Sequence, residues 1–230
     1  MSIQSTSSPC NIHGYFHSKL KIQPIENNLV VSNKTELENI AKQAGFKGKV
    51  LDNLRTIDLT TRDIILLYTS EGSLTDYTGV TNMTTTAEKI QLTVANFYLD
   101  VGGGWASFGY WLVLSKPKDH KEVIVEHIQL NDIFTEPEFE GIENTDILAG
   151  KLFDAYYLLD ENERKWAQRQ LASSQEEWEK EPVYALASPR SKQCLENYIE
   201  LYRREEQNKT EANKRLAQLR LRVCGRPLEL

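Results

Sequence analysis

IILLY, residues 64–68, is an uninterrupted run of aliphatic residues closed by a tyrosine, with polar residues on both sides. Such a run is typical of a strand that is buried on both faces, so we expect it at the centre of a sheet. Apolar and polar residues alternate in residues 90–94, 106–115 and 122–130, which predicts three further strands. Short turns are the simplest connections between them, including one at residues 116–120. We therefore expect a mainly antiparallel β-sheet of roughly three to five strands.

One amphipathic helix is predicted ahead of the IILLY run. Asn33 and Glu36 have the spacing of a capping box at its start, and Gly45 is typical of its end. Between them, apolar residues recur at helical spacing: Leu37, Ile40, Ala41 and Ala44. We expect this early helix to lay its apolar stripe on the sheet, after a short strand at residues 29–31.

The last third of the chain predicts helices almost throughout. Its first helix carries a broad apolar stripe, made of Ile147, Leu148, Leu152, Phe153, Tyr156, Tyr157 and Leu159. Asp160 and Glu163 form a second capping box, which starts a new helix. Ser188 begins the final helix and Gly225 ends it, which gives a helix of about 35 residues. A break near Asn208, where the sequence is polar on all sides, is an equally good interpretation.

These elements predict an α+β fold in four segments. Residues 1–10, which are rich in Ser and Thr, are expected to form a disordered leader. Residues 11–130 are expected to form the α+β sheet domain, and residues 131–145, with Pro and Gly among acidic residues, a linker. Residues 146–230 form the helical region, which we expect to pack partly on the sheet and to end in the long helix.

Composition narrows the classes of function. The 230 residues carry a net charge of −6, which disfavours binding to nucleic acid, since phosphate backbones require clustered Lys and Arg. The sequence has neither a signal-peptide pattern nor a long apolar stretch, so we expect a cytoplasmic protein without membrane contact. The three cysteines are widely separated, and the four histidines form no ligand motif. We expect no metal and no cofactor.

Two glycine-containing segments stand out between the predicted strands. Residues 71–86 predict a long loop or a ragged hairpin. Gly102, Gly103 and Gly104, which follow Asp100 and precede Trp105, can bring the backbone close to a phosphate or an oxyanion. The surrounding sequence matches neither a P-loop nor a dinucleotide fingerprint, so a wide loop without a ligand is the simpler interpretation.

The predicted strand at residues 106–115 is unusually aromatic. Tyr110 and Trp111 fall on opposite faces, because successive strand side chains alternate. An exposed Trp111 would form an apolar platform for a ligand or a partner. We expect instead that the C-terminal helices cover it, since those helices need a sheet face on which to bury their own apolar stripes.

The end of the long helix offers a second candidate surface. Leu216, Leu219 and Val223 form a thin apolar stripe, through which the helix would pair with another protein or with a second copy of this chain. Without a catalytic signature in the sequence, we favour a non-catalytic protein–protein interaction module, such as an inhibitor, an immunity-type protein or an assembly adaptor. The alternative is a small hydrolase or transferase with an acidic site near Gly102–Gly104. It would use Asp100 or a nearby acid, with Trp105 and Tyr110 stacking on the substrate.

Overall fold

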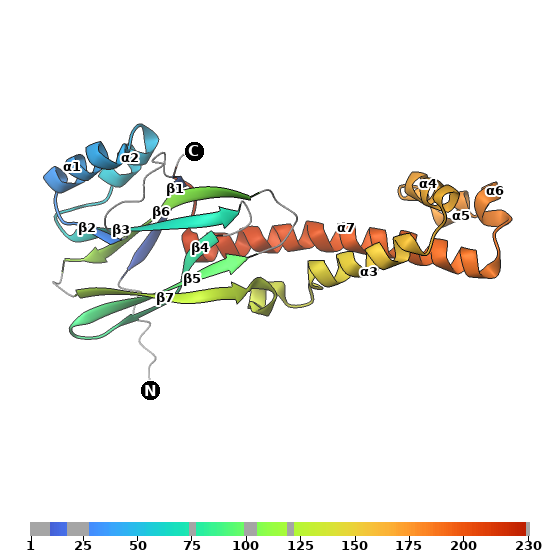
Figure 1. Ribbon diagram of the computed structural model, residues 1–230. Coiled ribbons are helices and arrows are strands. Elements are labelled where there is room, and N and C mark those ends of the chain that lie inside the picture. Colours follow the sequence, from blue (N-terminus) through green and yellow to red (C-terminus); the bar gives the residue numbers. More distant parts are fainter. Residues whose placement is uncertain (1–9, 18–27, 74–76, 99–104, 119–121, 229–230) are drawn as a thin grey trace. The chain divides into compact units, whose positions relative to one another are not determined.

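The computed structural model describes residues 10–17, 28–73, 77–98, 105–118 and 122–228 (Figure 1). Its strands, early helices and long C-terminal helix confirm the predicted α+β class. The chain forms two compact units: Met1–Ile133 with Ala217–Leu230, and Phe134–Leu216. The end of the long helix therefore belongs to the same unit as the strands. The predicted leader, apart from Cys10, lies outside the described residues.

The first sheet of unit 1 has four antiparallel strands in the order β1-β6-β3-β2. The strands are β1 (Asn11–His17), β2 (Asn28–Val31), β3 (Arg62–Ser73) and β6 (Trp105–Pro117). IILLY lies in β3, one of the two inner strands, and all five of its side chains are buried. Alternate residues of β3 therefore fill a core on each side of the sheet, as the sequence predicted.

The second sheet has three strands in the order β4-β5-β7. The strands are β4 (Tyr77–Thr85), β5 (Lys89–Tyr98) and β7 (Glu122–Asp132). β4 pairs with β5 antiparallel, whereas β5 pairs with β7 parallel. The predicted hairpin through residues 116–120 is wrong, because β6 and β7 belong to different sheets. Residues 71–86, predicted as a long loop or a ragged hairpin, are mostly strand: β3 runs to Ser73, and β4 covers Tyr77–Thr85 in the other sheet.

Two helices cover one face of the first sheet (Figure 1). α1 (Lys34–Ala44) is the predicted helix, with Asn33 accepting a hydrogen bond from the Glu36 backbone at 2.9 Å and Gly45 left-handed at φ 73°. α2 (Lys49–Arg55) follows it and was not predicted. Their buried side chains share one core with alternate residues of β3 and β6: Leu37, Ala41, Val50, Leu54, Ile64, Leu66, Tyr68, Trp111 and Val113.

A polar network joins the two sheets at Thr78 of β4. The hydroxyl of Tyr110, on β6, accepts a hydrogen bond from the Thr78 amide and donates one to the Thr78 carbonyl. The Thr78 hydroxyl lies 2.9 Å from the Thr69 hydroxyl on β3 and 2.6 Å from Oδ1 of Asn96 on β5. Thr78 and Tyr110 are both buried, so these bonds form where water does not compete for them.

The last turns of α7 (Pro189–Cys224) complete unit 1. Leu219 and Val223 are fully buried, and Gly79 of β4 lies directly beneath Val223: a Cβ at position 79 would lie 2.3 Å from a Val223 methyl carbon. Gly225 ends the helix at φ 75°, as predicted. The following residues run along β1, where the Tyr15 amide donates to the Arg226 carbonyl at 3.1 Å and the Leu228 amide donates to the Tyr15 carbonyl at 2.8 Å.

Unit 2 is helical. After two short 3-10 turns, η1 (Ile133–Thr135) and η2 (Pro137–Phe139), its helices are α3 (Thr145–Tyr157), α4 (Glu161–Gln170), α5 (Gln175–Trp178), α6 (Pro182–Ala185) and most of α7. The capping box of Asp160 and Glu163 is confirmed at the start of α4. Of the two interpretations of the final helix, the continuous one is confirmed, since α7 runs through Asn208 as one helix of 36 residues.

α3 and α7 run side by side in opposite directions. At one end, the Asn208 side-chain amide accepts a hydrogen bond from the Glu143 amide at 3.0 Å and donates one to the Glu143 carbonyl at 2.7 Å. At the other end, the ring of Tyr156 lies 6.1 Å from that of Tyr198. The aromatic residues Trp166, Trp178 and Tyr184, one each from α4, α5 and α6, close the core beside α7.

Replacing Leu219 with Ala tests the docking of the α7 end in unit 1. Because Leu219 is fully buried, we expect the substitution to lower the free energy of unfolding by about 2–5 kcal/mol. Leu221→Ala is the matched control, because Leu221 is 51% exposed and its loss is expected to change stability by less than about 0.5 kcal/mol. Urea denaturation measures both variants, and equal effects would contradict the assigned orientation of the helix end.

Candidate functional site

The glycine segment predicted as a site lies outside the described residues. Gly102, Gly103 and Gly104 are not described, and neither are Asp100 and the side chain of Trp105. Binding or catalysis at this segment therefore stays a prediction.

Tyr110 and Trp111, the aromatic candidates beside that segment, are core residues. Trp111 is 1% exposed and lies beneath Phe46, which follows α1, with ring centroids 5.6 Å apart. The expectation that the C-terminal helices cover Trp111 is wrong, because α1 and the segment leading to α2 take that sheet face. Tyr110 points to the opposite side, toward Thr78. Neither ring forms a surface platform in this structure.

The candidate stripe at the end of α7 is used within the chain. Leu219 and Val223 are fully buried in unit 1, and Leu216 is partly buried. A helix with an apolar stripe needs a partner, and here the strands of the same chain supply it. The stripe therefore does not present Leu219 or Val223 to a second protein.

A partly buried polar cluster in unit 1 comes closest to catalytic geometry among the described residues. His13 is the extra residue of a β-bulge in β1, between Ile12 and Gly14. Its Nε2 lies 2.7 Å from Oγ of Ser115, which also accepts a hydrogen bond from Nε of Arg62 at 2.7 Å. A hydroxyl beside an imidazole is the arrangement of an activated nucleophile. Ser115 is nevertheless fully buried, so a substrate cannot reach it and we interpret the cluster as structural.

Burial is the main reason that the pKa of His13 lies below its usual value, and the positive charge of Arg62 lowers it further. The unfolded chain therefore takes up a proton at a higher pH than the folded one. We expect the free energy of unfolding to fall as pH drops from neutral through 6.5 towards the folded pKa, and to show no further His13 contribution below it.

Denaturation at a series of pH values, together with His13→Gln, tests this assignment. The variant has no titrating imidazole at position 13, so its stability should vary less with pH over this interval than that of the wild type. NMR titration gives the pKa of His13 directly. A value at or above that of a model histidine would contradict the buried, neutral assignment.

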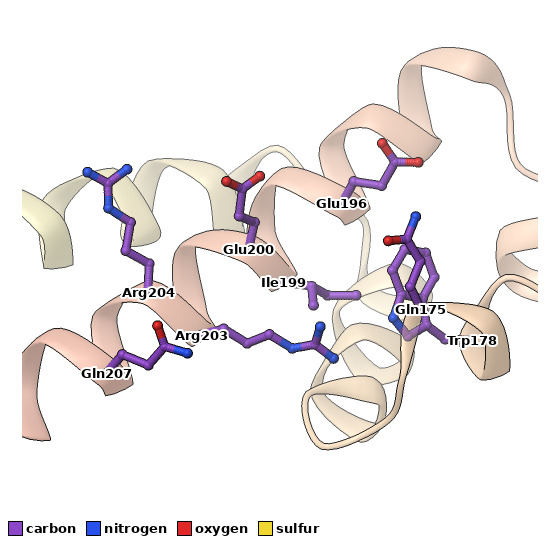
Figure 2. A pocket seen from close by; sticks show the side chains of 8 residues that line it. All are labelled: Gln175, Trp178, Glu196, Ile199, Glu200, Arg203, Arg204 and Gln207. Atoms are coloured by element: carbon purple, nitrogen blue, oxygen red, sulfur yellow. The ribbon is translucent and has the colours of Figure 1, made fainter.

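A groove of about 580 Å³ lies in unit 2 between α5 and α7 (Figure 2). Its lining is Gln175, Trp178, Glu196, Ile199, Glu200, Arg203, Arg204 and Gln207. The α7 residues recur at helical spacing, so one face of that helix forms one wall. This lining contains no serine, cysteine or histidine, and its only candidates for acid–base chemistry are the carboxylates of Glu196 and Glu200.

The charged side chains of this groove are largely engaged within unit 2. Arg203 donates to the backbone carbonyls of Leu171 and Ser173, just beyond the C-terminal end of α4. Arg204 forms an ion pair of 2.6 Å with Glu143. Because these groups already hold helices together, the groove is better explained as part of the packing of unit 2 than as a reaction site.

Glu196 has a similar internal role. It accepts a hydrogen bond from the Tyr184 hydroxyl, and this bond is the main reason that the pKa of Tyr184 is raised to about 12. The bond fixes α6 to the first half of α7. Trp178 also lines the groove, and its buried Nε1 has no hydrogen-bond partner among the described residues.

The outer face of α3 is the most apolar exposed surface that any described helix presents. Four of its large side chains are between 57% and 63% exposed: Ile147, Phe153, Tyr157 and Leu158. The opposite face of the same helix packs within unit 2 through Leu148 and Ala155, which are buried. We call the four exposed residues the α3 outer face.

The sequence carried a signal for this surface that the candidate sites did not include. The apolar stripe predicted for residues 147–159 is broader than the one face that a helix in a small unit can bury. The ring centroids of Phe153 and Tyr157 lie 4.6 Å apart, so the two aromatic side chains form one continuous patch. Isolated exposed apolar residues are common, whereas four exposed apolar side chains close together make this face a candidate for contact with a partner.

The described residues contain no group of three or more His, Cys, Asp or Glu side chains placed to hold a metal ion. Within the same residues, no helix combines the length and the apolar character that crossing a membrane requires. Comparison with protein-family models, with curated proteins and with solved structures gives no match.

Proposed function

We propose that this protein is a non-catalytic protein–protein interaction module whose binding surface is the α3 outer face. An inhibitor, an immunity-type protein or an assembly adaptor would use a surface of this kind. The observation that carries the proposal is the double-sided apolar character of α3, which buries one face in its own unit and exposes Ile147, Phe153, Tyr157 and Leu158 on the other.

The energetics of α3 support this assignment. Moving a large apolar side chain from water into a packed interface contributes about 1.5–3 kcal/mol. Three or four such side chains on one helix face provide the hot spot that a moderate-affinity interface needs. Phe153 and Tyr157 are also of the aromatic type that is enriched in interfaces.

Charge favours a protein partner over a nucleic acid. The chain carries a net charge of −6, and Asp146 and Asp154 lie on α3 beside the exposed apolar side chains. Carboxylates at this position repel a phosphate backbone, whereas the surface of a protein can offer Lys or Arg to meet them.

Affinity capture tests the proposal, with the wild type compared with a Phe153→Ser, Leu158→Ser double variant. We expect the wild type to retain one stoichiometric protein, either from a lysate of the source organism or as a second copy of itself. The double variant should weaken that binding by at least about tenfold, because it removes two apolar anchors.

Leu186→Ser is the matched control. Leu186 is 86% exposed, lies in unit 2 and is outside α3, so its replacement removes a more exposed apolar side chain without touching the α3 outer face. All variants are first shown to be folded by circular dichroism. Equal binding by the double variant and the control would refute the proposed surface. A wild type that binds neither itself nor another protein would refute the function.

A further inference from the structure

Four residues along one edge of the α3 outer face, the edge that lies away from Phe153, have the spacing of a coiled-coil seam. Ile147, Lys151, Asp154 and Leu158 follow one another at intervals of four, three and four residues. This is the alternation of d and a positions in a heptad, and it places all four on one line along the helix. Leu158 directly follows the last residue of α3 and keeps right-handed helical angles, so it continues the line.

This seam is complementary to itself in one antiparallel register. When two helices pair antiparallel about a two-fold axis, each d residue of one helix faces an a residue of the other. The residue numbers of the two facing residues add up to the same total all along the seam. The register that places Ile147 opposite Leu158 of a second copy also places Lys151 opposite Asp154 of that copy. Apolar residues then meet at both ends and opposite charges meet twice at the centre.

We propose that the occupant of the α3 outer face is a second copy of this chain, paired through antiparallel contact of the two α3 helices. This inference rests on the proposed function and names the partner of the same surface. The charges decide the orientation, because any parallel in-register pairing would place Lys151 against Lys151 and Asp154 against Asp154.

Gly150 and Tyr157 fit the same arrangement. Both occupy the position that precedes an a residue, so they flank the seam on the same side. A Cβ placed at Gly150 meets no atom within 4 Å, so the surface there is open. In the antiparallel register the exposed ring of Tyr157 lies near Gly150 of the second copy, and the missing side chain gives that ring room.

The charged centre of the seam is accessible in the single chain. Lys151 is about half exposed and lies 2.7 Å from Glu143 of its own chain, so its ammonium group can contact Asp154 of a second copy while it stays near Glu143. Asp154 is exposed on the same face. Polar pairs at such positions reduce the stability of a coiled coil but fix its register and orientation.

Charge reversal across the two copies tests the pairing. Lys151→Asp makes the centre of the seam acidic in both copies, and Asp154→Lys makes it basic in both. Each variant alone should therefore weaken self-association by at least about tenfold relative to the wild type. An equimolar mixture of the two should recover association, because acidic and basic seams then face each other.

Analytical ultracentrifugation over a concentration series measures the mass of the wild type, of each variant and of the mixture. Lys151 also pairs with Glu143, so its replacement could disturb the fold of the single chain. A second variant pair avoids this problem: Ile147→Lys and Leu158→Glu. These two positions face each other in the same register, and neither wild-type side chain forms an ion pair. The same pattern of loss and recovery is expected for this pair.

Two sets of outcomes overturn the inference and separate it from the proposed function. A wild type that stays monomeric at every concentration, while the α3 outer face still captures another protein, refutes the second copy and leaves the interaction module standing. Self-association that neither variant pair weakens, or that their mixtures do not recover, places the contact elsewhere and refutes the antiparallel α3 pairing.

Discussion

The hydrogen bonds of the Tyr110 hydroxyl to both backbone groups of Thr78 are the interaction on which unit 1 depends. Thr78 lies on β4 and Tyr110 on β6, so these bonds connect the two sheets directly. Cys224, at the end of α7, reaches the same Thr78 carbonyl at 3.3 Å. Two sheets and the last turn of the longest helix therefore meet at one buried residue. An unpaired amide or carbonyl there would carry a large desolvation cost, which explains why all these elements converge on it.

In unit 2, polar side chains likewise form hydrogen bonds with the backbone groups that helix ends leave unpaired. Arg203 of α7 donates to the carbonyls of Leu171 and Ser173, and Asn208 binds both backbone groups of Glu143 just before α3. These bonds fix α3 and α4 along α7 through polar contacts, while the aromatic core fills the space between them. One side of α3 is thereby committed to the unit. Its other side keeps a row of exposed apolar side chains that no packing need of the unit explains.

Burial explains why the candidate interaction surface in the structure differs from the one predicted from the sequence. The sequence placed the partner stripe at the end of α7, on Leu216, Leu219 and Val223, because an amphipathic helix at a chain end suggests an unfilled interface. The strands of unit 1 fill that interface within the chain, and Leu219 and Val223 are fully buried. The same reasoning applied to α3 gives the opposite result, since its stripe is too broad for one packed face. The apolar pattern of a sequence thus identifies the helices that need to pack against something. Which of their apolar faces remain exposed depends on how many of them the fold can cover.

Local signals in the sequence determined the α+β class, the buried strand at residues 64–68, and the helix boundaries at Asn33, Gly45, Asp160, Ser188 and Gly225, because caps and apolar runs act over a few residues. Only the tertiary structure decided which strands pair, that β7 lies parallel to β5 in a second sheet, and that His13 meets Ser115 from 102 residues away. Alternation in a strand specifies its faces and not its neighbours, so pairing depends on contacts between segments that are distant in sequence. For the same reason, the exposure of the α3 outer face follows from how the rest of unit 2 packs.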